Sequence, residues 1–130
     1  IEMPTESETR RDVMVIDRAT QRLLSLYDIV LIEGAGGLAV PITDTFMAID
    51  YVQSRRLPLI LVTNGVLGSI NHTILSLEAI RTRGIELSAV LYNEHFDTDK
   101  TIAADTRAFI ARYVARHFPS TRFATIPSIK

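Results

Sequence analysis

The fold is decided by the stretch LILVTNGVLGSINHTILSLEAI, which occupies residues 59–80. Its first four residues form an unbroken apolar run, which is typical of a strand buried on both faces of a parallel sheet. A loop with two glycines comes next, and Ile74, Leu77 and Ile80 then recur at the spacing of one helix face. A strand that leads through a short loop into a helix predicts part of a βαβ unit.

The same order repeats on both sides of this stretch. Unbroken apolar runs at residues 29–32 and 89–92, and a weaker run at 123–126, predict three more strands. Further helical patterns lie at about residues 9–25, 45–56 and 99–117. Because strands and helices alternate, the sequence predicts an α/β fold with a doubly wound, mostly parallel sheet, in a single domain over residues 1–130.

Capping residues predict where these helices begin and end. Asp44 or Thr45 is expected to begin the helix that runs to about Arg56. Ser69 or Asn71 is expected to begin the next helix, and Gly84 to end it. In the last helix, the residues expected to be buried are Ile102, Phe109, Ile110 and Tyr113.

Composition and charge exclude several classes of function. The chain is 47% hydrophobic and 22% charged, with a net charge of -1 and no clustered Lys/Arg tract, so neither nucleic acid nor a membrane is an expected partner. Without cysteine there is no disulfide or thiol nucleophile, which is compatible with a cytoplasmic location. No apolar run approaches the roughly 18–20 residues of a membrane span. The start at Ile1 rather than Met suggests a fragment.

Ligands of doubly wound sheets bind beyond the carboxyl ends of the strands, so the loops there are the candidate sites. The first is Glu33-Gly34-Ala35-Gly36-Gly37. A carboxylate at the end of a buried strand is costly without a partner, and metal-bound phosphate is a common partner there. The glycines would let backbone N–H groups approach an anion. The alternative is a solvated strand end followed by an ordinary turn.

The second candidate loop is Thr63 to His72, which leads into a helix. A helix N-terminus offers free N–H groups and a partial positive charge, so it can hold a carboxylate or phosphate without a lysine. The backbone positions available for this are Gly68, Ser69, Ile70 and Asn71. Alternatively, Ser69 or Asn71 is only a helix cap, and His72 only a residue of the helix surface.

The third candidate is Asn93, directly after the run at residues 89–92. Its amide can donate and accept hydrogen bonds to a nucleobase, although an asparagine there can equally be a turn residue. Ile126-Pro127-Ser128 follows the fourth run and could line the same pocket. His95, Asp97 and Asp99 are interpreted as a polar loop rather than as metal ligands.

Three segments together resemble one enzyme family in order and spacing. They are YDIVLIEGAGGLAVP at residues 27–41, LGSINHTILS at residues 67–76, and Asn93 followed by Ile126-Pro127. The glycine loop alone is shared with related P-loop amidotransferases and ligases, whereas the segment at residues 67–73 is more specific. The chain resembles the carboxy-terminal part of the ATP-dependent dethiobiotin synthetases, a family with a fold of the P-loop NTPase type, and would lack its N-terminal strands.

The resemblance implies a function. The family closes the ureido ring of dethiobiotin from 7,8-diaminononanoate, CO₂ and ATP, as a cytoplasmic homodimer that uses Mg²⁺. An amine carbamate attacks the γ-phosphate and the second amine then displaces phosphate, so no residue is expected to act as a protein nucleophile. By resemblance, Glu33 would be the Mg²⁺ ligand. The nucleotide-binding residues would be Glu33, Gly34, Ala35, Gly36, Gly37, Asn93 and Pro127. The substrate-binding residues would be Gly36, Leu67, Gly68, Ser69, Ile70 and Asn71, across the dimer interface.

The chain also departs from the family pattern. The family's G-x-x-x-x-G-K-T loop is absent, so the chain alone is predicted to be inactive. The family's substrate-associated tyrosine has no clear counterpart, because Asp105 or a neighbour stands near that place. Two alternatives remain: a non-catalytic dimerising or carboxylate-binding module derived from the family, and a fragment of a related cobyrinate-synthase-like or partition-ATPase-like protein.

Overall fold

A computed structural model describes residues 6–129 of the chain. They form two compact units that meet in the sequence between Arg55 and Arg56, and each unit is described by itself. Helices and strands alternate within an α/β fold, as the sequence predicts. In the described part, no helix is long and apolar enough to cross a membrane.

The first unit contains two helices and a small hairpin. Helix α1 spans Glu6–Leu24, strands β1 (Pro41–Thr43) and β2 (Phe46–Met47) pair antiparallel, and helix α2 spans Ala48–Ser54. The predicted helix start at Asp44 or Thr45 is wrong, because both residues lie in the turn between β1 and β2. Met47 caps α2 instead, and the Asp50 carboxylate accepts a hydrogen bond from the Met47 N–H at 2.8 Å.

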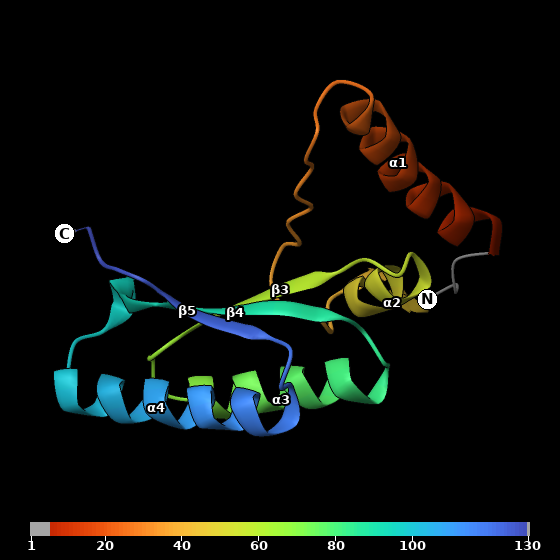
Figure 1. Cartoon of the computed structure of the whole chain (residues 1–130). Coiled ribbons are helices and arrows are strands. Elements are labelled where there is room, and N and C mark those ends of the chain that lie inside the picture. The colour runs from red at the N-terminus through yellow and green to blue at the C-terminus, as the bar shows by residue number, and fades with distance from the viewer. Residues whose placement is uncertain (1–5, 130) are drawn as a thin grey trace. The chain divides into compact units, whose positions relative to one another are not determined.

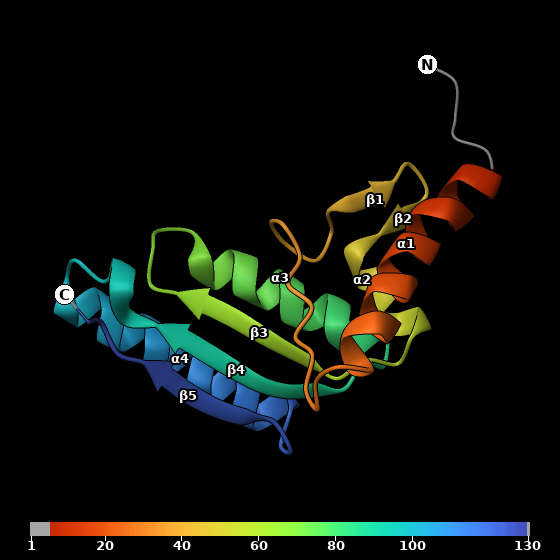
Figure 2. The same ribbon diagram turned by 90° about the horizontal axis from the view of Figure 1, so that it is seen from above.

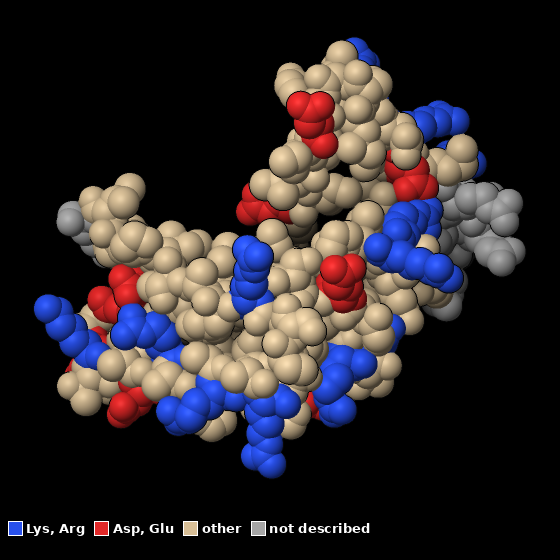
Figure 3. All heavy atoms as spheres, in the orientation of Figure 1, with Lys and Arg blue, Asp and Glu red and all other residues tan. Residues whose placement is uncertain are grey.

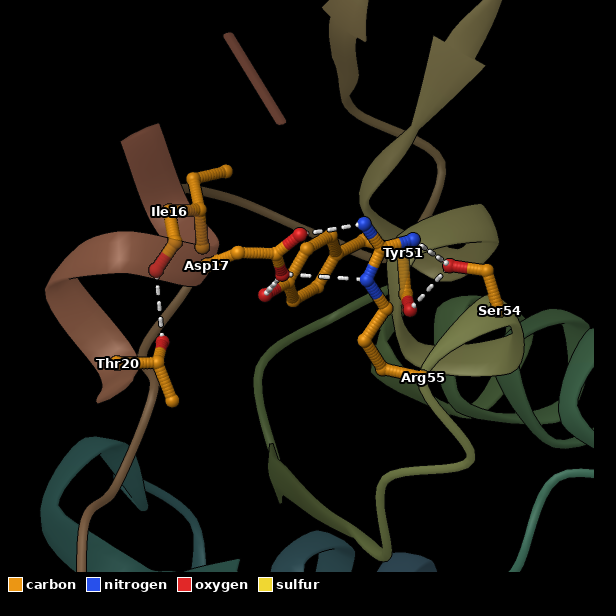
Figure 4. Close-up of polar contacts among 6 residues, drawn as sticks. All are labelled: Ile16, Asp17, Thr20, Tyr51, Ser54 and Arg55. Atoms are coloured by element: carbon orange, nitrogen blue, oxygen red, sulfur yellow. Dashed lines mark hydrogen bonds and ion pairs between the residues drawn. The ribbon is translucent and has the colours of Figure 1, made fainter. Parts of the chain in front are cut away.

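A polar cluster joins α1 to α2 (Figure 4). The Arg55 guanidinium donates to both carboxylate oxygens of Asp17, at 3.2 and 2.6 Å, and the buried Tyr51 donates its hydroxyl to the same carboxylate at 2.7 Å. The Arg55 guanidinium also lies over the Tyr51 ring, 5.0 Å from its centroid. These contacts hold the two helices together, because one carboxylate on α1 accepts hydrogen bonds from Tyr51 of α2 and from Arg55, the residue that follows α2.

The second unit is built on a parallel sheet. Strands β3 (Leu59–Asn64), β4 (Leu87–Asn93) and β5 (Arg122–Ile126) lie side by side in that order (Figure 2). Helix α3 (Ser69–Thr82) connects the first pair of strands, and the short helix η1 (Glu94–Phe96) with helix α4 (Lys100–His117) connects the second pair. The strands predicted at residues 59–62, 89–92 and 123–126 are therefore confirmed.

Both long helices of this unit cover the same face of the sheet (Figure 1). Two successive right-handed crossovers that advance in one direction place their helices on one side. The core lies between this face and the helices, and its fully buried members include Leu77, Ile80, Val90, Tyr92, Ile110 and Val114. On the opposite face, Ile60 and Val62 of β3 are 47% and 57% exposed, so the expectation that this strand is buried on both faces is wrong here.

The predicted strand at residues 29–32 is also wrong. This run is neither helix nor strand, and Ile29 and Leu31 are 79% and 82% exposed. A strand forms only where a neighbouring backbone completes its hydrogen bonds, and no segment within residues 6–129 pairs with this run.

The end of α3 and the start of α4 agree with the sequence. Gly84 follows α3 in the left-handed conformation, with φ +64°, and the Asp99 carboxylate caps α4 by accepting from two backbone N–H groups. The predicted buried face of α4 is only partly right. Ile110 is fully buried, whereas Ile102 and Phe109 are 60% and 41% exposed, because the face that packs on the sheet consists of Ala103, Thr106, Ile110 and Val114.

Candidate functional site

The carboxyl ends of the three parallel strands form one row. Asn64 of β3 pairs with Asn93 of β4, and Asn93 pairs with Ile126 of β5. Because the strands are parallel, the loops that follow these residues lie at the same edge of the sheet. The structure therefore brings Asn93 beside the chain that leads into Pro127, as the sequence predicts, and adds Asn64 as a third member of the row.

Asn93 is the last residue of β4 and is half-buried. Its side-chain oxygen Oδ1 accepts a hydrogen bond from the His95 N–H at 3.0 Å and caps η1. This is the role of a turn residue that the sequence allowed. Within residues 6–129 the amide nitrogen Nδ2 has no hydrogen-bond partner, so Asn93 can still donate to a ligand.

The start of α3 is open at the same edge. Gly68, with φ +90°, precedes the helix, and no side chain caps it. The Ser69 N–H donates to the Val66 carbonyl at 2.9 Å, while the N–H groups of Ile70 and Asn71 find no acceptor among the described residues. Asn71 is exposed and Leu67 is fully exposed. A helix tip with free amides is therefore accessible, as an anion site requires.

The predicted caps of this helix are wrong. Ser69 is the first residue of α3 rather than its cap, and its hydroxyl donates to the Asn64 carbonyl at 2.6 Å. The Asn64 side chain in turn accepts from the Val66 N–H at 3.1 Å. The hydroxyls of Thr63 and Thr73 form a buried hydrogen bond of 2.5 Å that fixes the end of β3 against α3. The turn is thus held by side chains from both elements. His72 lies on the exposed surface of α3.

A buried tyrosine lies below this edge of the sheet. The hydroxyl of Tyr92, which is fully buried, donates to Oδ1 of Asp97 at 3.0 Å and lies 3.4 Å from the carbonyl oxygen of Ala103. Burial first, and then the bond to Asp97, raise the pKa of Tyr92 to about 12. The hydroxyl therefore remains a hydrogen-bond donor at any physiological pH.

Gly65 contacts this pair. A Cβ atom at Gly65 would lie 2.2 Å from the Tyr92 hydroxyl oxygen and 2.6 Å from Oδ1 of Asp97. Such distances leave no room for a side chain at this position. The turn after β3 and the loop after β4 therefore touch each other at one point.

The glycine loop at residues 33–37 lies in the first unit. Glu33 is exposed and follows the exposed run at residues 29–32, so the premise that it ends a buried strand is wrong. Gly36 has φ +86°, and a Cβ there would lie 3.1 Å from Cγ2 of Val40, so the bend requires glycine at this position. Around Gly34 and Gly37 the space is open. The loop is thus a glycine bend that exposes its backbone.

The polar residues of the 93–99 loop have structural partners. Asp97 accepts from Tyr92, Asp99 caps α4, and Glu94 forms an ion pair with Arg107 at 2.7 Å. In the described part of the chain, no group of three or more His, Asp or Glu side chains could hold a metal. On the face of the molecule shown in Figure 3, Lys and Arg side chains are interspersed with Asp and Glu rather than gathered into one patch.

The contacts of three residues in this region do not follow from the sequence. Asn64 and Gly65 form an Asn-Gly pair one residue after the predicted strand at residues 59–62, and such a pair is a turn signal. Tyr92 belongs to the apolar run at residues 89–92, and nothing in its neighbours indicates that its hydroxyl has a partner five residues later.

The model of the family described as AAA domain matches residues 3–130. The ATP-dependent dethiobiotin synthetase BioD of Chlorobaculum tepidum is 51% identical over 106 residues, which are 82% of this chain and 44% of that protein. The BioD 2 proteins of Haemophilus ducreyi and Pasteurella multocida are 47% and 42% identical, over 83% and 88% of this chain.

The matches agree with the fold and with the motifs. The chain spans about half the length of the curated relatives that it matches. Its α/β architecture with a parallel sheet is that of the P-loop NTPase type. The chain belongs to the AAA-domain family, and the relatives to which it is similar over most of its length are ATP-dependent dethiobiotin synthetases.

Proposed function

We propose that this chain is the carboxy-terminal part of an ATP-dependent dethiobiotin synthetase, which carboxylates 7,8-diaminononanoate with CO₂ and closes the ring at the expense of ATP. One observation carries the proposal: dethiobiotin synthetases are 42–51% identical to this chain over more than four fifths of its length. The geometry supports it, because an open helix tip and an asparagine with a free amide nitrogen lie at one edge of a parallel sheet.

Asn93 is proposed to recognise the adenine. Its oxygen is engaged by the His95 N–H, so the group left for a ligand is the amide nitrogen, which can donate to a ring nitrogen of a purine. The exposed Pro127 follows β5, the strand that pairs with β4 up to Asn93, and its ring is proposed to lie against the base.

The tip of α3 is proposed to bind the carboxylate of the substrate, through Leu67, Gly68, Ser69, Ile70 and Asn71. The N–H groups of Ile70 and Asn71 are free within the described part, and the helix adds a partial positive charge at this end. The fully exposed Leu67 and the 39% exposed Ile70 give this tip an apolar surface. That surface is compatible with a homodimer in which the tip serves the substrate of the partner.

Glu33 is proposed as a ligand of Mg²⁺, and Gly34, Ala35, Gly36 and Gly37 as the backbone beside the phosphates and the diamine. A single carboxylate fits a magnesium ion whose other ligands are water molecules and phosphate oxygens, because Mg²⁺ commonly keeps several waters and takes only one or two carboxylates. Bound there, the ion would neutralise charge on the phosphates. The exposed glycine backbone contributes N–H groups without side chains in the way.

The chain alone is proposed to be inactive. Neither of its two lysines, Lys100 and Lys130, follows a glycine, so no phosphate-binding loop of the G-K-T kind is present. Positioning and charge neutralisation are what the protein contributes to this reaction, and the lysine of that loop supplies part of both. Formation of dethiobiotin by the purified 130-residue chain with ATP and Mg²⁺ would refute this.

A chimera tests the proposed activity directly. The 106 matched residues of the Chlorobaculum tepidum synthetase are replaced by the aligned residues of this chain, and dethiobiotin formation is measured. We expect an active chimera, and a loss of roughly 100-fold in kcat/KM on Glu33→Gln, the usual size of removing one charge-stabilising group. A folded chimera that binds the diamine without turnover would instead indicate a non-catalytic carboxylate-binding module.

Two further proposals have their own tests. Analytical ultracentrifugation of the chain would test whether it forms a homodimer. Cell fractionation would test the cytoplasmic location.

A further inference from the structure

Tyr92 fixes the loop that follows β4 from within the core. Its hydroxyl has two acceptors, Oδ1 of Asp97 at 3.0 Å and the carbonyl of Ala103 at 3.4 Å, which lie at the end of the loop and in the first turn of α4. A buried tyrosine hydroxyl needs such partners, because leaving it unpaired costs the full desolvation of the group. The loop end is therefore attached to the strand that it leaves.

This attachment continues to the side chain of Asn93. The Asp97 N–H donates to the carbonyl of Glu94 at 3.0 Å, which closes η1. His95, inside η1, donates its N–H to Oδ1 of Asn93 at 3.0 Å. The orientation of the Asn93 amide thus depends on η1, and the position of η1 depends on Asp97.

The same pair also contacts the turn that leads into α3. Gly65 approaches the Tyr92 hydroxyl and Oδ1 of Asp97 so closely that a Cβ would lie 2.2 and 2.6 Å from them. The neighbouring Asn64 accepts from the Val66 N–H, and its carbonyl accepts from the Ser69 hydroxyl. A shift of the tyrosine hydroxyl or of Asp97 would therefore displace Gly65 and, with it, the turn before α3.

We propose that Tyr92 and Asp97 are positioning residues. They hold the adenine-binding amide of Asn93 in place through η1, and they hold the substrate-binding tip of α3 in place through Gly65. The inference rests on the proposed function, since it assumes that these two loops carry the ligands. Neither side chain touches the ligand, and the pair acts through the loops. The high pKa of Tyr92 supports this role, because the hydroxyl keeps its proton and remains a donor.

A second tyrosine–carboxylate pair provides a matched control. The Tyr113 hydroxyl donates to the Glu78 carboxylate and joins α4 to α3. Tyr92→Phe and Tyr113→Phe therefore remove the same chemical group, a tyrosine hydroxyl bonded to a carboxylate. The first removes it from the edge of the sheet that carries the candidate ligand loops, and the second from the contact between α3 and α4. Each variant removes one hydroxyl group, and only the first loses a contact to the candidate ligand loops.

The first measurement needs no ligand. In the 130-residue chain, amide hydrogen exchange is followed by NMR at His95, Asp97 and Val66. We expect Tyr92→Phe and Asp97→Ala to accelerate exchange at these amides by about 3- to 10-fold, the equivalent of one lost hydrogen bond. Tyr113→Phe should leave these amides unchanged relative to the rest of the chain. Asp97→Asn keeps an acceptor oxygen and should restore slow exchange. Unchanged exchange in Tyr92→Phe would overturn the inference.

The second measurement is the affinity for AMP, which carries the adenine without needing a phosphate-binding lysine. We expect Tyr92→Phe and Asp97→Ala to weaken AMP binding by about 3- to 10-fold, and Asp97→Asn and Tyr113→Phe to bind as the wild type does. If Asn93→Ala weakens AMP binding and Tyr92→Phe does not, the inference is wrong while the adenine site stands. If the wild-type chain does not bind AMP, or if Asn93→Ala binds it equally well, the adenine assignment and the inference are both wrong.

Discussion

Gly65 lies so close to Tyr92 that a Cβ atom on the glycine would be 2.2 Å from the tyrosine hydroxyl oxygen. The two residues belong to neighbouring parallel strands and their loops, 27 positions apart in the sequence. Their contact is the point where the turn before α3 meets the loop before α4. Substitutions here test whether the two loops stabilise each other.

Gly65→Ala is expected to lower the free energy of unfolding by about 1–3 kcal/mol, because the added methyl group would clash with the Tyr92 hydroxyl and with Asp97. In the Tyr92→Phe background the same substitution should cost less. The contact at 2.2 Å disappears with the hydroxyl, and the next tyrosine atom, Cζ, lies 3.4 Å away. Urea unfolding followed by circular dichroism measures all four proteins of this cycle.

Gly37→Ala is the control for that cycle, because nothing lies within 4 Å of a Cβ there. Its effect should stay within about 0.5 kcal/mol. Additive costs of Gly65→Ala and Tyr92→Phe would contradict the close approach of the two residues.

The contact between Asp17 and Arg55 predicts a dependence of stability on pH. The Arg55 guanidinium, and then the Tyr51 hydroxyl, hold the pKa of Asp17 below its usual value of 3.8. A depressed folded-state pKa means that the stabilisation is complete above the unfolded pKa and is lost as the pH falls through the folded one.

Asp17→Asn should therefore destabilise the chain at pH 7 and have little effect once the pH lies below the folded-state pKa. We expect roughly 0.5–1 kcal/mol at pH 7, because side chains that are 36% and 33% exposed are partly screened by solvent. The measurement is the midpoint of urea unfolding from pH 7 down to pH 2. The exposed Asp12 on the same helix serves as the control through Asp12→Asn, and equal effects of the two substitutions would contradict the role of the pair.

Glu78 predicts a titration that can be observed directly. Its hydrogen bond from Arg81, and then the one from Tyr113, lower its pKa from 4.5 to about 2. Its contribution to stability is accordingly present above the unfolded value and declines between about pH 4.5 and 2.

NMR of the Glu78 carboxyl carbon measures that pKa. Arg81→Ala should raise the pKa of Glu78 more than Tyr113→Phe does, because the bond from Arg81 is the larger cause. Titration of the wild-type carboxyl near 4.5, or the opposite order of the two variants, would contradict the geometry of this cluster.

The open tip of α3 predicts that a bulky residue abolishes ligand binding there without affecting the fold. Asn71 is exposed, so Asn71→Trp should unfold at the same temperature as the wild type in the absence of ligand. Saturating 7,8-diaminononanoate, at about 100 times its Kd, should stabilise the wild type by about 2.7 kcal/mol. The variant should lose this gain, because the indole covers the free N–H groups of Ile70 and Asn71.

Leu75→Trp is the control for that experiment. Leu75 is 62% exposed one turn further along α3, away from the free amides, so the stabilisation by the diamine should persist. Equal stabilisation of the Asn71→Trp variant would show that the carboxylate binds elsewhere.

The sequence alone determined the features that repeat over short distances. Apolar runs and helical spacing predict β3, β4, β5 and the helices between them, because the side-chain period of each element is local. Gly84 marks the end of α3 correctly, since a residue in the left-handed conformation acts on its immediate neighbours. The candidate positions at the strand ends follow from the same alternation, because parallel strands end at one edge.

Only the tertiary structure decided which of these features find partners. The run at residues 29–32 has the composition of a strand and is none, because strand formation needs a neighbouring backbone that no described segment supplies. Ser69 could have capped α3, yet its hydroxyl binds the Asn64 carbonyl. The contact of Tyr92 with Gly65 joins residues that are distant in the sequence. Neither local propensity nor periodicity carries information about such a contact, which depends on the register of two strands and on the path of two loops.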